Sequence, residues 1–288
     1  MQTSATHAAA ARHNNNGRIG SSITATDDRV KTSQQTNSLE RALAILELVA
    51  YKSGGLSNGE ICARLKIPTS TASYILSRLE REGFLRRETD TGRYEIGLKV
   101  VALSHGAFRD MGLRRIAEPI LHNLAAETRV SGFVAVLERG RVMIVDKVER
   151  PGLAKIDMDI GVRYPAHSTA LGKSMLAHLP KDQLHELFEQ YGLPKSSPKT
   201  IDSKIRLLEE LEAVRKQGYS TSDGELYLGF RAIAAPIFGL SGEVRAAVSA
   251  TGITLLVDDG KVIKSVRTAA HEISLRIAAA ELDKTPRR

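Results

Sequence analysis

The sequence predicts an α+β protein in which a small winged helix-turn-helix precedes a larger domain built on an antiparallel sheet. Two observations lead to this prediction. Between Ser38 and Gly97 the pattern runs helix, helix, turn, helix and hairpin, which is the order of a winged helix-turn-helix. After Thr128 the hydrophobic period changes from that of a helix to that of a strand, and strand pairs then alternate with helices up to Ala280.

Length and composition fit a globular protein of two domains. The chain has 288 residues, and an average domain has about 150. Its 42% of hydrophobic and 26% of charged residues are ordinary, and no apolar run approaches the roughly 18 residues that span a bilayer. Cys62 is the single cysteine, which excludes an intrachain disulfide framework and a Cys-rich zinc site. These features fit a protein of the reducing cytoplasm, where we expect it to act.

The charge distribution permits nucleic-acid binding without indicating it by itself. The net charge is +8, yet residues 38–97 carry nine Lys/Arg against eight Asp/Glu, a net charge of about +1. A prediction of DNA binding therefore depends on the local residue pattern.

The first helix follows a polar, aperiodic segment. Residues 1–37 lack an apolar core, so we expect a disordered tail there and neither a signal peptide nor a membrane anchor. Ser38 is expected to cap the helix. Its apolar positions recur at helical spacing at Leu39, Leu43, Leu46 and Val49.

Two further helices complete the helix-turn-helix. Ser57 and Glu60 form a capping box at the start of the second helix, because each side chain can bond the backbone N–H of the other residue. The chain then turns at Pro68, and a third helix is predicted from Ser70 to Arg81. The residues expected to face inward from the second helix are Ile61, Cys62 and Leu65.

The third helix has one apolar and one polar face. The apolar stripe, at i, i+3, i+4 and i+7 spacing, consists of Ala72, Ile75, Leu76 and Leu79. A helix of this shape fits the major groove of DNA, about 12 Å wide, and its N-terminal residues reach base edges. The polar residues that we expect to contact double-stranded DNA are Ser70, Thr71, Ser73, Tyr74, Ser77 and Arg78.

A hairpin after the third helix supplies the predicted wing. Its extended segments are Phe84–Glu88 and Arg93–Ile96, joined by a Thr-Asp-Thr-Gly turn. We expect Arg86, Arg87 and Arg93 to bind phosphates beside the groove or to enter the minor groove. Two other interpretations stay open: a solvated helix face beside a hairpin, and a winged helix that binds protein.

A linker over Leu98–Arg115 is predicted to precede the second domain. Its helical pattern begins at Leu98 and runs to about His105. Gly192 and Gly218 are expected to end helices. The other predicted helices are 111–128, 170–178, 181–191, 203–217 and 259–280. The predicted strands are 133–137, 142–148, 153–158, 230–238 and 244–251.

The segment His167–Ser174 allows two interpretations. Its end, Gly172-Lys173-Ser174, resembles a phosphate-binding P-loop, but that motif needs Gly at the position that His167 occupies. We therefore reject nucleotide binding and expect no cofactor. Because the segment leads into a helix, backbone N–H groups near Ala170 and Leu171 could instead hold a carboxylate.

Several segments of the chain resemble the IclR family of bacterial transcriptional regulators. The similarity covers about Ser38 to Ala280. The matching segments are Ser38–Leu46 (SLERALAIL), Pro68–Ala72 (PTSTA), Asp90–Gly97 (DTGRYEIG), Pro165–Lys173 (PAHSTALGK) and Gly229–Pro236 (GFRAIAAP). Each motif is modest alone, but their joint order and spacing are specific.

The resemblance implies a GAF-like effector-binding domain over residues 116–281, with a tail at 282–288. It also implies homodimers, often paired as dimers of dimers, that bind palindromic operators and respond to small organic or aromatic acids. The effector contacts that it implies are Ala170, Leu171, Ser222 or Asp223, Ala232, Ser249 and Thr251. Met158 and Phe230 would form apolar walls.

The chain departs from the family pattern at Tyr74 of the third helix and at Ala232 of the effector-binding domain. The family often has Arg at the position of Tyr74, whereas here an Arg stands one turn later, at Arg78, on the same face. Our hypothesis is that Arg78 takes over part of that contact. The family also often has Cys at the position of Ala232.

Two other classes of function compete with a regulator. One is an enzyme with a nucleic-acid-binding module that uses His167 or Glu225, but the sequence offers no nucleophile elbow and no metal-ligand spacing. We expect His167 to be structural, and Asp223 and Glu225 to be solvated loop carboxylates or ligand contacts. The other is an interaction protein that uses its winged helix for partners. The sequence does not distinguish repressor from activator or dimer from tetramer.

Overall fold

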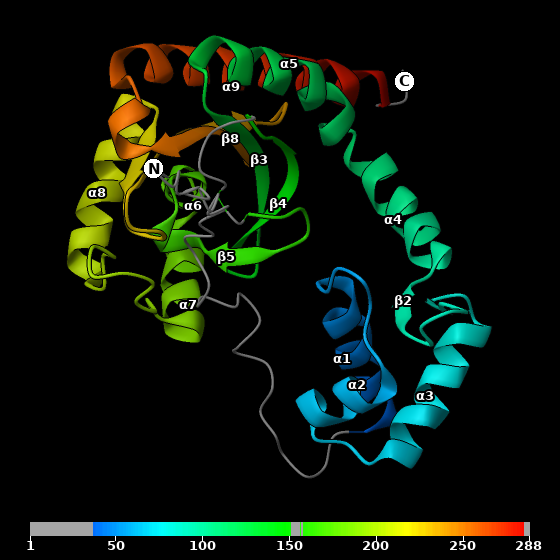
Figure 1. Ribbon diagram of the computed structural model, residues 1–288. Helices are drawn as coiled ribbons and strands as arrows, with labels where there is room; N and C mark the ends of the chain where they lie inside the picture. The colour runs from blue at the N-terminus through cyan, green and yellow to red at the C-terminus, as the bar shows by residue number, and fades with distance from the viewer. Residues whose placement is uncertain (1–36, 151–155, 157, 285–288) are drawn as a thin grey trace, which may run out of the picture.

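The structure, a computed structural model, describes residues 37–150, 156 and 158–284, with the backbone alone for 105–111 and 284. Two domains are joined by one helix, and the smaller domain holds the blue and cyan elements of Figure 1. The predicted disordered tail lies outside the described residues except for Asn37. At the other end, the last helix continues to Lys284 into the predicted C-terminal tail.

The small domain is a winged helix-turn-helix, as predicted. Its elements are α1 (Ser38–Ala50), α2 (Asn58–Leu65), α3 (Thr69–Arg81), β1 (Leu85–Arg87) and β2 (Tyr94–Ile96). The two strands pair antiparallel, and Leu56 adds an isolated bridge to Tyr94. The fully buried side chains of its core are Ile45, Leu56, Ile61, Ala72 and Leu76.

The start of α1 differs from the prediction. Asn37, and not Ser38, caps the helix: its Oδ1 accepts a hydrogen bond from Glu40 N at 2.9 Å, and its N donates to Glu40 Oε2 at 3.0 Å. The buried positions of α1 are Ile45 and Val49, with Leu46 packed beside them. Leu39 and Leu43 are 67% and 52% exposed, because α1 turns a different stripe toward α3 and β2 than the Leu spacing indicated.

The linker helix α4 (Leu98–Met111) is longer than the predicted helix, which ended at His105. Gly112, with φ of 57°, separates it from α5 (Leu113–Thr128). Leu113 is already buried in the core of the second domain, so the linker ends before Arg115.

The second domain is built on a six-stranded antiparallel sheet in the order β5-β4-β3-β8-β7-β6. The two predicted hairpins form its centre. They consist of β3 (Ser131–Glu138) with β4 (Arg141–Val148), and β7 (Phe230–Phe238) with β8 (Val244–Ile253). β3 and β8 join them side by side. The edges are β5 (Arg163–Pro165) and β6 (Ser220–Asp223).

Helices cover both faces of this sheet (Figure 1). One face packs on α5 and α9 (Asp259–Lys284) through a core that includes Leu121, Val248 and Ile273. The other face packs on α6 (Ala170–Leu176), with α7 (Lys181–Tyr191) and α8 (Lys204–Gln217) beyond it. Short 3₁₀ turns precede α6 at Ala166–Ser168 and follow β8 at Thr254–Leu256.

Both edge strands were missing from the prediction. β6 has the polar sequence Ser-Thr-Ser-Asp, and β5 contains a proline, so neither carries the apolar alternation that identifies strands. The predicted strand over 153–158 lies mostly outside the described residues, and its two described members, Ile156 and Met158, belong to no strand.

Within the described part of the chain, no helix combines the length and the apolar character needed to cross a membrane.

Candidate nucleic-acid interface and ligand pocket

The predicted polar face of α3 is exposed. Ala72, Ile75 and Leu76 are buried against α1 and α2, so the opposite side of the helix faces away from the domain. The exposed residues there are Ser70, Ser73, Tyr74, Ser77, Arg78 and Arg81, and Thr71 is half-buried at the border. Figure 1 shows α3 on the outer side of its domain, away from the sheet domain. The sequence-predicted residues therefore lie together on one open surface.

Contacts between side chains order part of this surface. The guanidinium carbon of Arg78 lies 5.3 Å from the centre of the Tyr74 ring, which is a cation–π arrangement. Asn58 Nδ2, from the first turn of α2, donates to Ser73 Oγ at 2.8 Å. The sequence analysis missed Asn58, whose only signal is its place after the cap Ser57.

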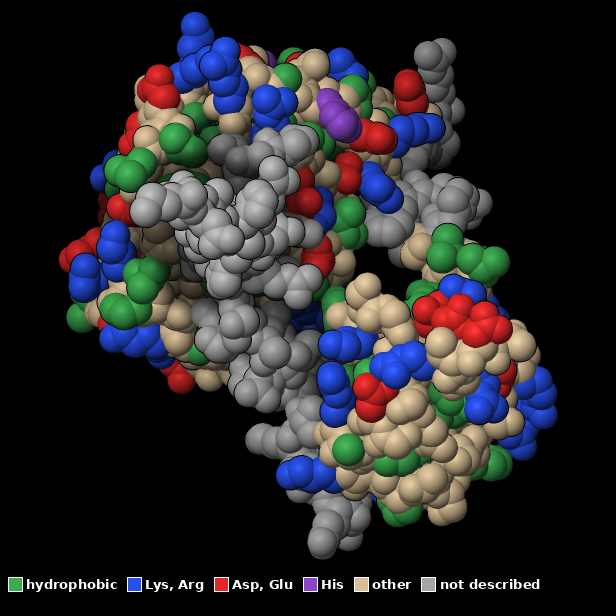
Figure 2. All heavy atoms as spheres, viewed as in Figure 1, with side chains coloured by type: hydrophobic (Ala, Val, Ile, Leu, Met, Phe, Trp, Pro, Cys, Tyr) green, Lys and Arg blue, Asp and Glu red, His purple; other side chains and the backbone are tan. Residues whose placement is uncertain are grey.

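The wing presents two exposed arginines beside α3. Arg86 pairs with Glu95 across the hairpin. Arg87 Nε donates to Gly92 O at 3.2 Å, and its guanidinium lies over the Tyr94 ring. Both side chains keep an exposed surface, and Figure 2 shows Lys and Arg side chains around the outer edge of this domain.

Arg93 differs from the other two arginines. Its Nη2 lies 2.7 Å from Glu60 Oε2, and it donates to Gly54 O at 3.0 Å and Gly55 O at 3.1 Å. Hydrogen bonds from Ser57, together with Arg93, lower the pKa of Glu60 to about 2. The predicted capping box of Ser57 and Glu60 is thus confirmed, and Arg93 connects it to the wing.

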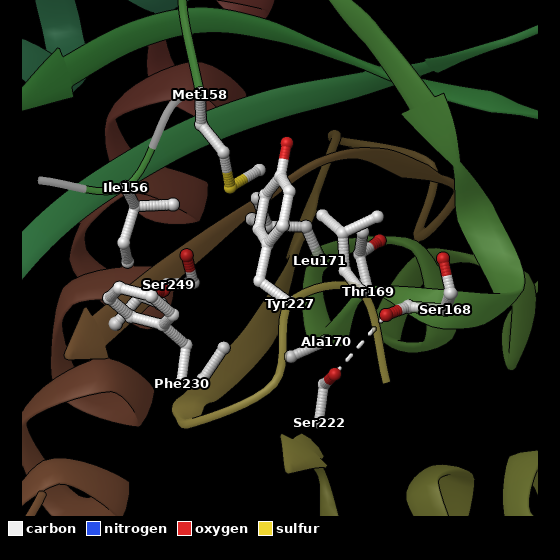
Figure 3. Close-up of a pocket in the computed structure, with 13 residues that line it drawn as sticks. Ile156, Met158, Ser168, Thr169, Ala170, Leu171, Ser222, Tyr227, Phe230 and Ser249 are labelled. Atoms are coloured by element: carbon white, nitrogen blue, oxygen red, sulfur yellow. Dashed lines mark hydrogen bonds between the residues drawn. The ribbon is translucent and has the colours of Figure 1, made fainter. Parts of the chain in front are cut away.

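The second candidate site is a pocket between the start of α6, the sheet and the loop after β6. Six of the predicted effector residues line it: Ala170, Leu171, Ser222, Ala232, Ser249 and Thr251. The two predicted apolar walls, Met158 and Phe230, also line it. The lining residues that sequence reasoning missed are Ile156, Ser168, Thr169, Leu226 and Tyr227. Figure 3 shows these side chains converging from separate elements.

Hydroxyl groups supply the polarity of the pocket. Among its described lining residues none is charged. Ser222 Oγ donates to Ser168 O at 3.2 Å, and Thr169 Oγ1 accepts from Gly172 N at 3.0 Å. Ser249 Oγ is buried without a hydrogen-bond partner, which is costly unless a ligand or water supplies one. Figure 3 draws this oxygen within the ring of lining side chains.

The pocket is largely filled by its own side chains. Its cavity volume is about 30 Å³, room for about one or two waters. In Figure 3 the Tyr227 ring lies at the centre, with Met158 above it and Phe230 to its lower left. An aromatic acid therefore fits only after some of these side chains move.

Glu225 is not the solvated loop carboxylate that the sequence suggested, whereas the side chain of Asp223, at the end of β6, keeps 40% of its surface exposed. Asp223 points away from the pocket, where it accepts from Thr254 Oγ1 and pairs with Lys199 and Arg231 at 3.6 and 3.7 Å. Glu225 is 8% exposed, because it follows β6 into the space between α6 and α8.

Glu225 belongs to a buried ion cluster. Its Oε1 lies 2.6 Å from the Nζ of Lys173, which is fully buried and also bonds Glu210 of α8. Burial raises the pKa of Glu225, and the Lys173 charge opposes that rise. The lysine of the P-loop-like segment thus joins α6, α8 and the loop that carries Leu226 and Tyr227 into the pocket wall.

His167 has the surroundings of a structural histidine. Its Nε2 lies 3.1 Å from Pro194 O, and burial lowers the pKa of the ring. Gly172 is needed beside it, because an added Cβ would lie 2.1 Å from Ala166 O. In the described residues, no group of three or more His, Cys, Asp or Glu side chains could hold a metal ion.

A winged helix-turn-helix joined to a second domain that contains a pocket is the architecture of a one-component DNA-binding transcriptional regulator. Comparison with known proteins identifies the family. Residues 105–275 match the family described as bacterial transcriptional regulator IclR, C-terminal. Residues 38–89 match the IclR helix-turn-helix domain. The chain belongs to the IclR family of transcriptional regulators, whose members are not enzymes.

Relatives match along most of their length. The chain is 32% identical to the transcriptional repressor IclR of Escherichia coli over 84% of this chain and 90% of the relative. It is similar to the crystal structure of Thermotoga maritima IclR, with 28% identity and a TM-score of 0.71 over 85% and 100% of the two chains. An IclR homologue from Microbacterium hydrocarbonoxydans, complexed with 4-hydroxybenzoate, gives 25% identity and a TM-score of 0.76 over 84% and 100%.

Proposed function

We propose that this regulator binds a palindromic operator through α3 and the wing, and that a small organic or aromatic acid in the pocket shifts its affinity for that operator. It acts in the cytoplasm, with residues 38–97 as the DNA-binding domain and 116–281 as the effector domain. The observation that carries the proposal is the exposed polar face of α3, fixed by a core on its opposite side.

The side chains that we propose to contact DNA are those that α3 and the wing leave exposed. Arg78 and Tyr74 stack on one another halfway along α3, so the guanidinium reaches the surface that the family's usual Arg would occupy at position 74. Arg86 and Arg87 border this surface and supply phosphate contacts. Arg93 is left out, because its guanidinium is used by Glu60 and two backbone carbonyls.

The pocket suits a small acid with an apolar body. Met158, Tyr227 and Phe230 supply contact area for a ring. The backbone N–H groups of Ala170 and Leu171, at the start of α6, lack acceptors within the helix and are available to a carboxylate. Ser249 Oγ supplies a further hydrogen bond. The 4-hydroxybenzoate complex of the Microbacterium homologue supports this class of ligand.

Binding is coupled to the DNA-binding domain by a direct contact as well as by the linker α4. Tyr51 Oη, at the end of α1, donates to Gly161 O at 3.4 Å. Gly161 lies three residues after Met158 of the pocket wall. A ligand that displaces Met158 therefore moves the segment whose Gly161 carbonyl accepts the hydrogen bond from Tyr51. A ligand shifts operator affinity by preferring one arrangement of the two domains.

The regulator acts as a homodimer, and pairs of dimers form the tetramer. Exposed apolar side chains on α1 and α4 support a contact between copies, since an isolated domain would leave them in water. These residues are Leu39, Leu43, Leu98 and Val101. A twofold dimer places its two α3 helices on half-sites about 34 Å apart, or a multiple of that distance.

The test is binding to labelled DNA from the region flanking its own gene. Anisotropy titrations at several salt concentrations, with and without a panel of small aromatic and aliphatic acids, should give sequence-selective, salt-dependent binding that one class of acid shifts. Binding without sequence preference would contradict an operator-reading role. The absence of any DNA binding would favour an interaction protein.

A further inference from the structure

A second and much larger hollow lies on the far side of α6, between α7 and α8. Its volume is about 620 Å³, within the range of about 300–1,000 Å³ typical of small-molecule sites. Its apolar lining consists of Leu176, Ala177, Leu179, Leu184, Phe188, Leu208 and Leu211. We call this hollow the α7–α8 groove. None of its lining residues lines the pocket described above.

Cations dominate the edge of the α7–α8 groove. Its charged lining residues are Lys181, Lys204, Arg215, Lys216 and Glu212. The carboxylate is in contact with Lys216, and Lys216, Lys181 and Arg215 together lower the pKa of Glu212. On the face of the sheet domain seen at the left of Figure 2, hydrophobic side chains lie among Lys and Arg side chains.

Two of these cations are available to a ligand. Lys204 pairs with Glu189, and Lys216 pairs with Glu212. Arg215 uses its Nε on Ala177 O at 2.6 Å, which holds the guanidinium at the groove wall and leaves its Nη groups for another acceptor. Lys181 makes no ion pair within 4.0 Å among the residues that the structure describes.

We propose that the α7–α8 groove binds an amphipathic organic anion, with a hydrocarbon body on the leucines and Phe188 and one carboxylate at Lys181 and Arg215. The volume argues for a small molecule over a helix from a protein. A hollow of this volume lies in the range of small-molecule sites, and the cations at its edge complement a single carboxylate.

The position of the groove relates it to the first pocket. α6 begins with Ala170 and Leu171 in the pocket wall and ends with Leu176 in the groove wall. Glu210 of α8 bonds Lys173 in the middle of the same helix. A ligand that moves α8 therefore acts on α6, and the two sites affect one another's affinity reciprocally.

The test is calorimetric titration of the full-length protein with decanoate, kept below its micelle concentration. We expect one decanoate per chain in the groove. Hexanoate should bind at least tenfold more weakly, because each buried methylene contributes about fourfold in affinity. Decylammonium, with the same chain and the opposite charge, should also bind at least tenfold more weakly than decanoate.

Two variants with matched controls locate the site. Lys181→Glu should weaken the binding of decanoate about tenfold, whereas Lys264→Glu on α9 should not. Lys181 is the first residue of α7, where an acidic residue favours the helix, so this variant should fold. Leu208→Ser should weaken it about fivefold, because Leu208 is half-exposed in the groove, whereas Leu275→Ser on α9 should not. Ser249→Val in the first pocket should leave decanoate binding unchanged.

Three results would overturn the proposal. The first is no binding of decanoate. The second is equal binding of decanoate and decylammonium, which would indicate apolar adsorption without charge recognition. The third is equal affinity of Lys181→Glu, Leu208→Ser and their controls. If a second copy of the chain covers the groove instead, decanoate will not bind, and Leu208→Glu will reduce the assembly size in analytical ultracentrifugation.

Discussion

Replacing Lys173 by Met should destabilise the effector domain strongly, although the two side chains are similar in length. Lys173 is fully buried, and its Nζ lies 2.6 Å from Glu225 Oε1 while also bonding Glu210. The substitution leaves the carboxylate of Glu225 buried without a cation. Removing one partner of a buried ion pair costs about 3–5 kcal/mol. For a domain of this size, each kcal/mol lowers Tm by about 2–4 °C, so Tm should fall by about 6–20 °C.

Two comparisons make the prediction specific. Glu225→Gln should cost much less, about 1 kcal/mol, because Lys173 keeps its contact with Glu210 and the orphaned Glu225 Oε2 is no longer part of a charge. The double variant Lys173→Met/Glu225→Gln should recover part of the loss. Differential scanning calorimetry at pH 7 separates the transition of the effector domain from that of the winged helix. A Lys173→Met protein within about 1 kcal/mol of the wild type would refute the reasoning.

The pH dependence gives a second check on the same cluster. Burial raises the pKa of Glu225 above 4.5, so the folded state binds a proton that the unfolded state releases, and this group's contribution to stability decreases as the pH rises from 4.5 through its raised pKa. Without Lys173 that pKa should rise further. The stability gap between Lys173→Met and the wild type should therefore be small near pH 4 and widen toward pH 7.

Three further predictions concern the pocket and the winged helix. Ser249→Val should weaken the binding of the effector acid, measured by calorimetric titration, about fivefold to tenfold. It should not lower Tm, because the Ser249 hydroxyl has no hydrogen-bond partner to lose. Unchanged affinity would remove Ser249 from the proposed contacts. Asn37→Ala should lower the urea-unfolding free energy of the winged helix by about 1 kcal/mol, whereas Ser38→Ala should change it little; the reverse order would restore Ser38 as the cap. Glu60 has a pKa of about 2, below its ordinary 4.5, so its contribution to the stability of the winged helix is present above pH 4.5 and lost as the pH falls toward 2. Glu60→Gln should flatten this part of the acid-unfolding curve followed by circular dichroism.

Local patterns predicted most of the fold. Periodicity located α3, α7, α8 and both central hairpins, because each of these elements buries a continuous apolar stripe. Two edge strands were missed because their pairing depends on neighbours distant in sequence. β6, for example, is held by β7 and not by any alternation of its own. The length of α4 was also missed, since a linker helix with exposed apolar residues carries no clear stripe.

The sites were predicted unevenly for the same reason. The polar face of α3 follows from the spacing of its own buried residues, so sequence alone located it. The roles of Lys173 and Glu225 depend on partners 37 and 52 residues from Lys173, which only the folded chain brings together. Likewise, Arg93 looked like a wing cation until the fold placed it beside Glu60.

The most direct test of the central claim is operator binding by Arg78→Ala, compared with Arg267→Ala on α9. Arg78 is exposed on α3 and stacks on Tyr74, so its loss should weaken operator binding by about 1–3 kcal/mol, or roughly fivefold to 150-fold, and relax the preference at one base pair. The Arg267 variant should bind like the wild type. Equal operator affinity and equal sequence preference for Arg78→Ala and the wild type would contradict the claim that this face of α3 reads DNA through Arg78.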